Sequence, residues 1–184
     1  MKKHLVVIAS AMLMACALPA YAQPGAGGGG RGGAAGATPA QQINETTSGP
    51  PADVMFYGSS RSAISNGVMI PANRAMLMMS GVAPGRMTPA GDTAAQAENI
   101  LANIQTQLKN HGLSMKDVVY LRAFVVPDPN KDKKIDMQGW SAAYAKYFGT
   151  PENPTKPARA TIGVAALVGA DQLIEIEIIA AYPK

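Results

Sequence analysis

The residue types that could do chemistry gather near the C-terminal end of this 184-residue chain. Arg159 begins a short apolar run, and Glu175 and Glu177 alternate with isoleucines in the last such run. A guanidinium can hold a carboxylate through two parallel charge-assisted bonds, and a carboxylate can position a water and transfer a proton. These three residues could therefore form a site for a small anionic substrate.

The sequence has few residues that could support thiol chemistry or bind a metal ion. The single cysteine, Cys16, and one of the two histidines, His4, lie in an N-terminal leader, so the rest of the chain has only His111. One histidine cannot form a two-histidine zinc site, and we expect neither a metal ion nor a cofactor. A serine triad would need His111, which stands at a predicted helix end, where a solvated histidine is favoured.

The first 22 residues have the three parts of a secretory signal peptide. A basic start precedes an apolar run from Leu5 to Leu18, and small residues end the segment at Ala22. The run is shorter than the roughly 20 residues that a bilayer span needs. We therefore expect cleavage after Ala22 and an exported, periplasmic protein with no membrane span. Lipidation at Cys16 is the alternative, although Met14 fits a lipoprotein cleavage box poorly.

Residues 23–52 are dominated by Gly, Ala, Pro and polar residues and lack the apolar content that a core requires. They predict a flexible linker, followed by one domain over residues 53–184. Gly25 to Gly30 formally matches G-x-G-x-x-G. No predicted strand precedes this match and no predicted helix follows it, which excludes a dinucleotide-binding motif.

The charge of the chain gives no basis for a nucleic-acid partner. The formal net charge is +4, and Lys2 and Lys3 would leave with the leader. The remaining basic residues are scattered, whereas a nucleic-acid binder concentrates them on one face or helix. We therefore expect no binding to nucleic acid and no attraction to a membrane surface.

Hydrophobic periodicity predicts an α+β domain. The expected strands cover residues 54–57, 75–79, 117–126, 159–167 and 173–182. Asp92 can cap a helix that ends at Gly112, and a second helix is expected over about 135–148. This order places two helices on one face of a four- to six-stranded mixed sheet and leaves the other face uncovered. The aromatic residues of the second helix, Trp140 and Tyr144 among them, are interpreted as core.

The last two predicted strands are expected to form a hairpin with a turn near residue 170. Alternation puts the isoleucines of the final strand toward the helices and both glutamates on the uncovered face. The same parity puts Arg159 and Thr161 on the uncovered face. In this register Glu175 pairs near Ala165, roughly 20 Å from Arg159, so the two could share a site only between subunits. The alternative interpretation is a simply solvated face.

From about Ala63 to Ala181 the sequence resembles the RidA/YjgF family of 2-imino acid deaminases. The most specific segments are Pro157-Ala158-Arg159 and Ile174-Glu175-Ile176-Glu177, supported by Met79-Ser80-Gly81 and Asp117-Val118-Val119. The resemblance implies a chorismate-mutase-like fold and a homotrimer with three sites between subunits. It also implies hydrolysis of small 2-imino acids to 2-keto acids and ammonia without a metal or cofactor.

The resemblance assigns roles to individual residues. In the family, the arginine matched by Arg159 clamps the substrate carboxylate, and the glutamate matched by Glu175 helps to position the attacking water. Ser80 and Gly81 match residues that line the cleft, and Thr161 matches a strand position whose backbone contacts the substrate. Catalysis is therefore expected from Arg159 and Glu175, and substrate binding from Arg159, Ser80, Gly81 and Thr161.

Two positions depart from the family pattern. Gly67 stands where the family often has a cleft tyrosine, and Ser141 stands where its second helix carries an asparagine. The expected function is an exported imine or enamine deaminase. The alternative is a non-catalytic trimeric binding protein for keto acids that keeps the carboxylate clamp. Ribonuclease activity, sometimes attached to this family, is disfavoured by the small excess of positive charge.

Overall fold

The computed structural model describes residues 51–85 and 91–184. The predicted signal peptide, residues 1–22, and nearly all of the predicted linker, residues 23–52, lie outside these ranges. Within them, no helix is long and apolar enough to cross a bilayer.

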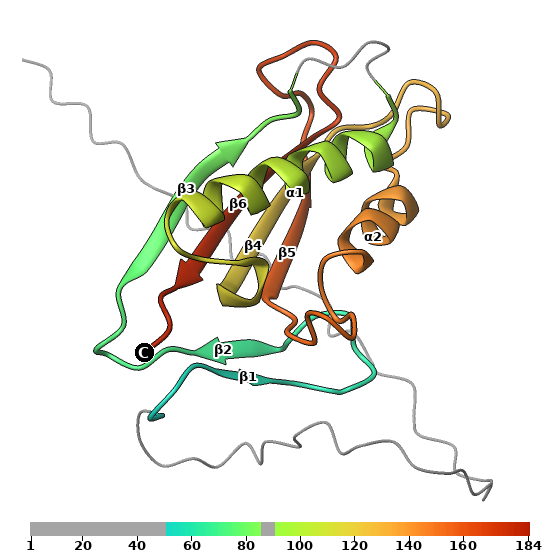
Figure 1. Cartoon of the computed structure of the whole chain (residues 1–184). Helices are drawn as coiled ribbons and strands as arrows, with labels where there is room; N and C mark the ends of the chain where they lie inside the picture. Colours follow the sequence, from blue (N-terminus) through green and yellow to red (C-terminus); the bar gives the residue numbers. More distant parts are fainter. Residues whose placement is uncertain (1–50, 86–90) are drawn as a thin grey trace, which may run out of the picture. The chain divides into compact units, whose positions relative to one another are not determined.

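The described chain forms a four-stranded mixed sheet, a separate two-stranded sheet and two helices (Figure 1). The small sheet pairs β1 (Met55–Tyr57) with β2 (Gly67–Met69) in antiparallel fashion. The larger sheet has the strand order β3-β6-β4-β5. Its strands and the helices are β3 (Met76–Val82), α1 (Thr93–Asn110), β4 (Val118–Val125), α2 (Met137–Ala145), β5 (Ala158–Gly163) and β6 (Ile174–Ala181).

Helix α1 forms as its sequence predicts. The side chain of Asp92 accepts a hydrogen bond from the backbone N–H of Ala95 at 2.9 Å, which caps the first turn. The helix ends at Asn110 with His111 as its C-cap, and the following Gly112 adopts a φ of 70° that favours glycine. One stripe of α1 is fully buried: Ala97, Ile100, Leu101, Ile104 and Leu108.

Helix α2 connects β4 to β5, and these two strands are parallel. The helix is shorter than predicted and ends at Ala145, before the turn at Gly149. The large aromatic residues Trp140 and Tyr144 of α2 are 0% and 2% exposed, and Phe148, in the turn after the helix, is 3% exposed. Their interpretation as core residues is therefore confirmed.

Both helices lie on the same face of the large sheet (Figure 1). Ile174, Ile176 and Ile178 of β6 point to that side and are at most 1% exposed, packed in one core with α1 and α2. Glu175 and Glu177 alternate with them on the other side, which we call the open face. The predicted α+β fold, a mixed sheet with two helices on one face, is confirmed.

The predicted hairpin between the last two strands is wrong. Strand β4 lies between them: β5 pairs only with β4, and β6 pairs with β3 and β4. Residues 164–173 cross the end of β4, where Val164 donates to the carbonyl of Val125 and Val126 donates to that of Leu173. Neighbours in sequence usually pair in space, but the α2 crossover makes β5 parallel to β4 and leaves the other edge of β4 to β6.

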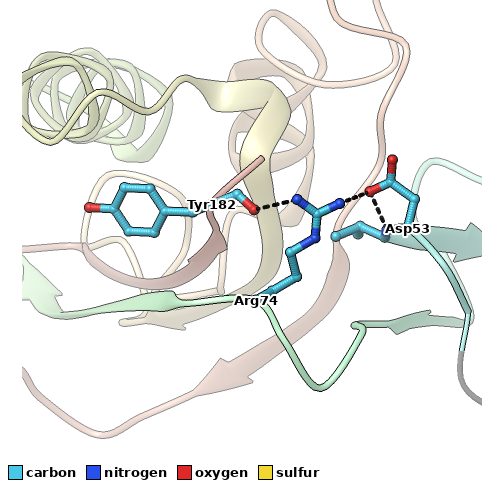
Figure 2. Close-up of polar contacts among 4 residues, drawn as sticks. Asp53, Arg74 and Tyr182 are labelled. Atoms are coloured by element: carbon cyan, nitrogen blue, oxygen red, sulfur yellow. Dashed lines mark hydrogen bonds and ion pairs between the residues drawn. The ribbon is translucent and has the colours of Figure 1, made fainter. Parts of the chain in front are cut away.

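The small sheet lies in the turn-rich segment where only β1 was predicted. Ser65 joins this segment to the start of β5, because it bridges to Ala158 and its hydroxyl donates to the carbonyl of Lys156 at 2.6 Å. Arg74 makes a second connection (Figure 2). Its nearly buried guanidinium pairs with Asp53 at 2.5 Å and donates to the carbonyl of Tyr182 at 3.4 Å.

The start of α2 generates a prediction about acid stability. Asp136 accepts a hydrogen bond from the N–H of Gly139 at 2.9 Å and lies 3.2 Å from the ammonium group of Lys131. The bond from Gly139, aided by Lys131, lowers the pKa of Asp136 below its ordinary value of 3.8 despite partial desolvation. Such a carboxylate stabilises the fold above its unfolded pKa and loses that contribution as the pH falls through its folded pKa.

We therefore expect Asp136→Ala to lower the free energy of unfolding by about 1 kcal/mol at neutral pH. Below the ordinary pKa of 3.8 the difference from wild type should shrink. Urea unfolding at neutral and acidic pH measures both values, with Asp171→Ala as the control for loss of an exposed carboxylate. A difference that stays constant down to the acid limit would contradict the assignment.

Candidate functional site

Strand β5 places Arg159 on the side of the sheet that the helices cover, contrary to the prediction. Arg159 pairs with Leu121, and Thr161 pairs with Ala123, whose side chains are fully buried on that side. The hydroxyl of Thr161 accepts a hydrogen bond from the indole N–H of Trp140 at 3.0 Å. Ile162, which follows Thr161 in the sequence, is 41% exposed on the open face. The prediction put Arg159 on the wrong face of β5 because it did not anticipate that α2 presents aromatic rings that an arginine can contact.

The guanidinium of Arg159 packs on two of these rings. Its central carbon lies 4.4 Å from the ring centre of Tyr144 and 5.4 Å from that of Trp140, both within the range of cation–π contacts. Burial lowers the pKa of Arg159 because desolvation disfavours the charged form, and Tyr144 opposes this shift only in part. No described carboxylate forms an ion pair with Arg159, and its buried Nη1 has no hydrogen-bond partner in the described chain.

Tyr144 adds a second donor beside this cation. Its hydroxyl is buried and, among the residues that the structure describes, has no hydrogen-bond partner. Burial raises the pKa of Tyr144 to about 12, so the phenol stays protonated and can donate at neutral pH. Buried donors without acceptors are costly. A ligand carboxylate would accept hydrogen bonds from Arg159 and Tyr144 together.

Both donors line one pocket with a volume of about 280 Å³. Its walls come from the loop before β2, from α2 and the turn after it, and from the start of β5. Three cationic residues line it, and its lining includes no carboxylate. The lining residues are Arg61, Ser62, Ala63, Ser141, Tyr144, Ala145, Phe148, Gly149, Lys156 and Arg159.

Glu175, Ser80 and Gly81 form a separate group on the open face. The β3–β6 register is interrupted between Met79 and Val82, and the carboxylate of Glu175 lies over Gly81, where it would overlap any added Cβ. Glu175 takes part in none of the ion pairs of the described chain, whereas Glu177 pairs with Arg122 at 3.2 Å. The glycine therefore leaves room for a free carboxylate.

One chain does not bring the two groups together. Glu175 is level with Phe124 on β4 and with Ile162 on β5, so it lies two strands away from Arg159. The register that placed Glu175 near Ala165 does not occur. Because Arg159 faces the helices and Glu175 faces away from them, their side chains are separated by the sheet itself.

The space beside Gly67, where the resemblance led us to expect a tyrosine, is occupied by another residue. The antiparallel partner of Gly67 on β1 is Tyr57, whose phenol ring occupies the space that a side chain on Gly67 would need. Ser141, the other departure from the family pattern, lines the Arg159 pocket.

Sequence reasoning missed three residues of this pocket as functional candidates. Tyr144 was interpreted only as core, although its spacing of four from Trp140 places both on one face of α2. Arg61 and Lys156 belong to no recognisable sequence motif, so no signal in the sequence marked them. Lys156 holds the loop before β2 by donating to the carbonyls of Ser60 at 2.8 Å and Ser62 at 2.7 Å.

Comparisons with known proteins show related chains. Residues 62–182 match the family described as Endoribonuclease L-PSP. The 3-aminoacrylate deaminase RutC of Acinetobacter baylyi is 35% identical over 117 residues, which cover 60% of this chain and 84% of the relative. Protein HMF1 of Saccharomyces cerevisiae is 34% identical over 110 residues, which cover 58% of this chain and 76% of the relative. The crystal structure of a Rid-family protein of unknown function, YyfB from Yersinia pestis, has a TM-score of 0.57 and 26% identity, covering 71% of this chain and all but 1% of its own.

The unpaired Arg159 generates a prediction about stability. Replacing a partly buried cation that has no carboxylate partner relieves a desolvation cost, which offsets the loss of the contacts to Tyr144 and Trp140. We expect Arg159→Leu to be at least as stable as wild type without ligand in urea unfolding. Leu101→Ala, a truncation of a fully buried core residue outside the pocket lining, should lose about 2–5 kcal/mol. A loss above about 2 kcal/mol in Arg159→Leu would instead assign Arg159 a structural role.

Proposed function

The chain belongs to the Endoribonuclease L-PSP family, which includes the RutC and RidA/YjgF proteins, and we propose that it is a deaminase of small 2-imino or enamine acids. One observation carries the proposal: Arg159 and Tyr144 line the same cationic pocket, and the buried Nη1 of Arg159 and hydroxyl of Tyr144 have no hydrogen-bond acceptor among the described residues. A substrate carboxylate supplies the missing acceptor. The relative RutC is named a deaminase of 3-aminoacrylate, a small enamine that carries a carboxylate.

The proposed reaction divides the work between the two groups of residues. Arg159 and Tyr144 hold the carboxylate, which orients the adjacent C=N bond. Glu175 positions a water and accepts its proton as the water oxygen bonds to the imine carbon. Return of that proton to nitrogen gives a carbinolamine. Transfer of its hydroxyl proton to the amino group, with Glu175 as the relay, lets the C–N bond break as the C=O bond forms, and the products are a 2-keto acid and ammonia.

We further propose that the complete site forms between copies in a homotrimer. Arg159 lies on the edge strand β5, whereas Gly81 lies on the opposite edge strand β3 and Glu175 lies on β6, the strand next to β3. Head-to-tail contact between identical chains brings opposite edges together and generates a ring when the rotation closes. The open face offers apolar surface for such contacts, with Met78 72% and Ile162 41% exposed.

Export to the periplasm remains part of the proposal. Its support is the basic start, apolar run and small-residue end of residues 1–22, with cleavage after Ala22. Lipidation at Cys16 is the alternative.

A keto-acid-binding protein without turnover is the second candidate. Its support is Gly67, which removes the family tyrosine from β2. Tyr57 of β1 provides a phenol in the adjoining space, but it lines a different pocket from Arg159. The two candidates differ in one measurable property, the hydrolysis of an imine.

The deaminase proposal predicts that the protein hydrolyses 2-iminopropanoate, generated by a coupled amino acid oxidase, faster than buffer does. Arg159→Ala removes two charge-assisted bonds, worth about 1.5–3 kcal/mol each, so kcat/KM should fall at least about 100-fold. Glu175→Gln should lower kcat by about 10²–10⁴-fold. Glu152→Gln, an exposed carboxylate outside the pocket lining, is the control. Binding of pyruvate with no imine hydrolysis would select the binding protein instead.

The divided site predicts complementation between inactive variants. In an oligomer made only of the Arg159→Ala variant, every site lacks the arginine. In an oligomer made only of the Glu175→Gln variant, every site lacks the carboxylate. Equal, randomly mixed subunits should place both intact residues in about one quarter of the sites. Activity of subunits refolded together, compared with the two variants refolded apart, measures this recovery. Recovery of no activity from mixed oligomers would place both residues in one protomer's site and overturn the arrangement.

A further inference from the structure

Arg61 is a second guanidinium on the pocket that contains Arg159. Its side chain is exposed, and no carboxylate of the described chain pairs with it. The backbone on both sides of it is fixed, because the ammonium of Lys156 donates to the carbonyls of Ser60 and Ser62. Arg61 is therefore a free cation on an anchored loop.

The charges of the pocket are unbalanced. Arg61, Lys156 and Arg159 all line it, and the lining contains no acidic residue. A single carboxylate held by Arg159 and Tyr144 would neutralise only one of these cations. Lys156 already uses its ammonium to hold two carbonyl groups, so Arg61 is the cation left to bind a ligand.

We propose that the substrate carries a second anionic group and that Arg61 binds it. This inference rests on the proposed deaminase function and names its substrate class, a four- or five-carbon 2-imino dicarboxylate. The partly buried Arg159 and the buried Tyr144 hold the carboxylate next to the C=N bond. The exposed Arg61 binds the distal carboxylate at the pocket mouth.

The pocket of one chain has room for a small ligand. Its volume of about 280 Å³ lies just below the roughly 300–1,000 Å³ that is typical of pockets for drug-sized ligands. A short dicarboxylate provides two anionic groups within this space. A guanidinium suits such a carboxylate because its planar N–H groups match both oxygens.

Binding of keto acids tests the substrate class separately from turnover. Calorimetry on the oligomeric mature protein compares 2-oxoglutarate with 2-oxobutanoate, which lacks the distal carboxylate. We expect 2-oxoglutarate to bind about tenfold more tightly, and Arg61→Gln to remove most of that preference. Arg61→Lys should restore part of it. Lys109→Gln, which removes an exposed cation outside the pocket lining, should leave both affinities unchanged.

Turnover of the matching imines, 2-iminoglutarate and 2-iminobutanoate, separates the two proposals. Equal kcat/KM for both, unaltered in ratio by Arg61→Gln, would overturn the role of Arg61 while the deaminase function stands. Selective binding of the dicarboxylate without hydrolysis of either imine would support the proposed ligand class and overturn the proposed deaminase function. Tighter binding of 2-oxobutanoate, or no binding of either keto acid, would overturn the inference outright.

Discussion

The contact of the Arg159 guanidinium with the ring of Tyr144 is the interaction on which the candidate site depends. At 4.4 Å from the ring centre, the cation is held in place without a carboxylate from the described chain. An internal ion pair would satisfy the arginine and close the site to ligands. An aromatic ring orients the guanidinium but accepts no conventional hydrogen bond, so its N–H groups stay available. The same burial that disfavours the free cation strengthens its interaction with an incoming carboxylate.

The order of the strands explains why one chain does not bring Arg159 and Glu175 together. Insertion of β6 between β3 and β4 leaves β3 and β5 at opposite edges. Arg159 on β5 and Glu175 on β6 then lie two strands apart and on opposite faces of the sheet. In a ring of identical chains, the strand order that separates the two groups within a chain is the one that would join them between chains. The bulged β3–β6 pairing at Ser80 and Gly81 gives the carboxylate of Glu175 its space.

Local pattern in the sequence predicted most of the elements but not their pairing. The stripe on α1, its cap at Asp92 and the alternating isoleucines of β6 follow from periods of 3.6 and 2, which depend only on neighbouring residues. The position of β4 between β5 and β6 depends on contacts between distant segments, and the hairpin prediction failed there. The prediction for the face of Arg159 failed for a related reason. Alternation in the predicted hairpin put Arg159 on the uncovered face, whereas α2 presents Trp140 and Tyr144 to it on the other face.

The distribution of positive charge favours a small anion over a polymer. A chain that binds nucleic acid presents many phosphate contacts along an extended basic surface. Here the cations of the site converge on one pocket of about 280 Å³, while Arg122 on the open face is paired with Glu177. A formal net charge of only +4 therefore does not exclude an anion site, because recognition depends on local rather than total charge. The family description as an endoribonuclease and the deaminase relative point to different chemistries, and this local concentration of charge supports the latter.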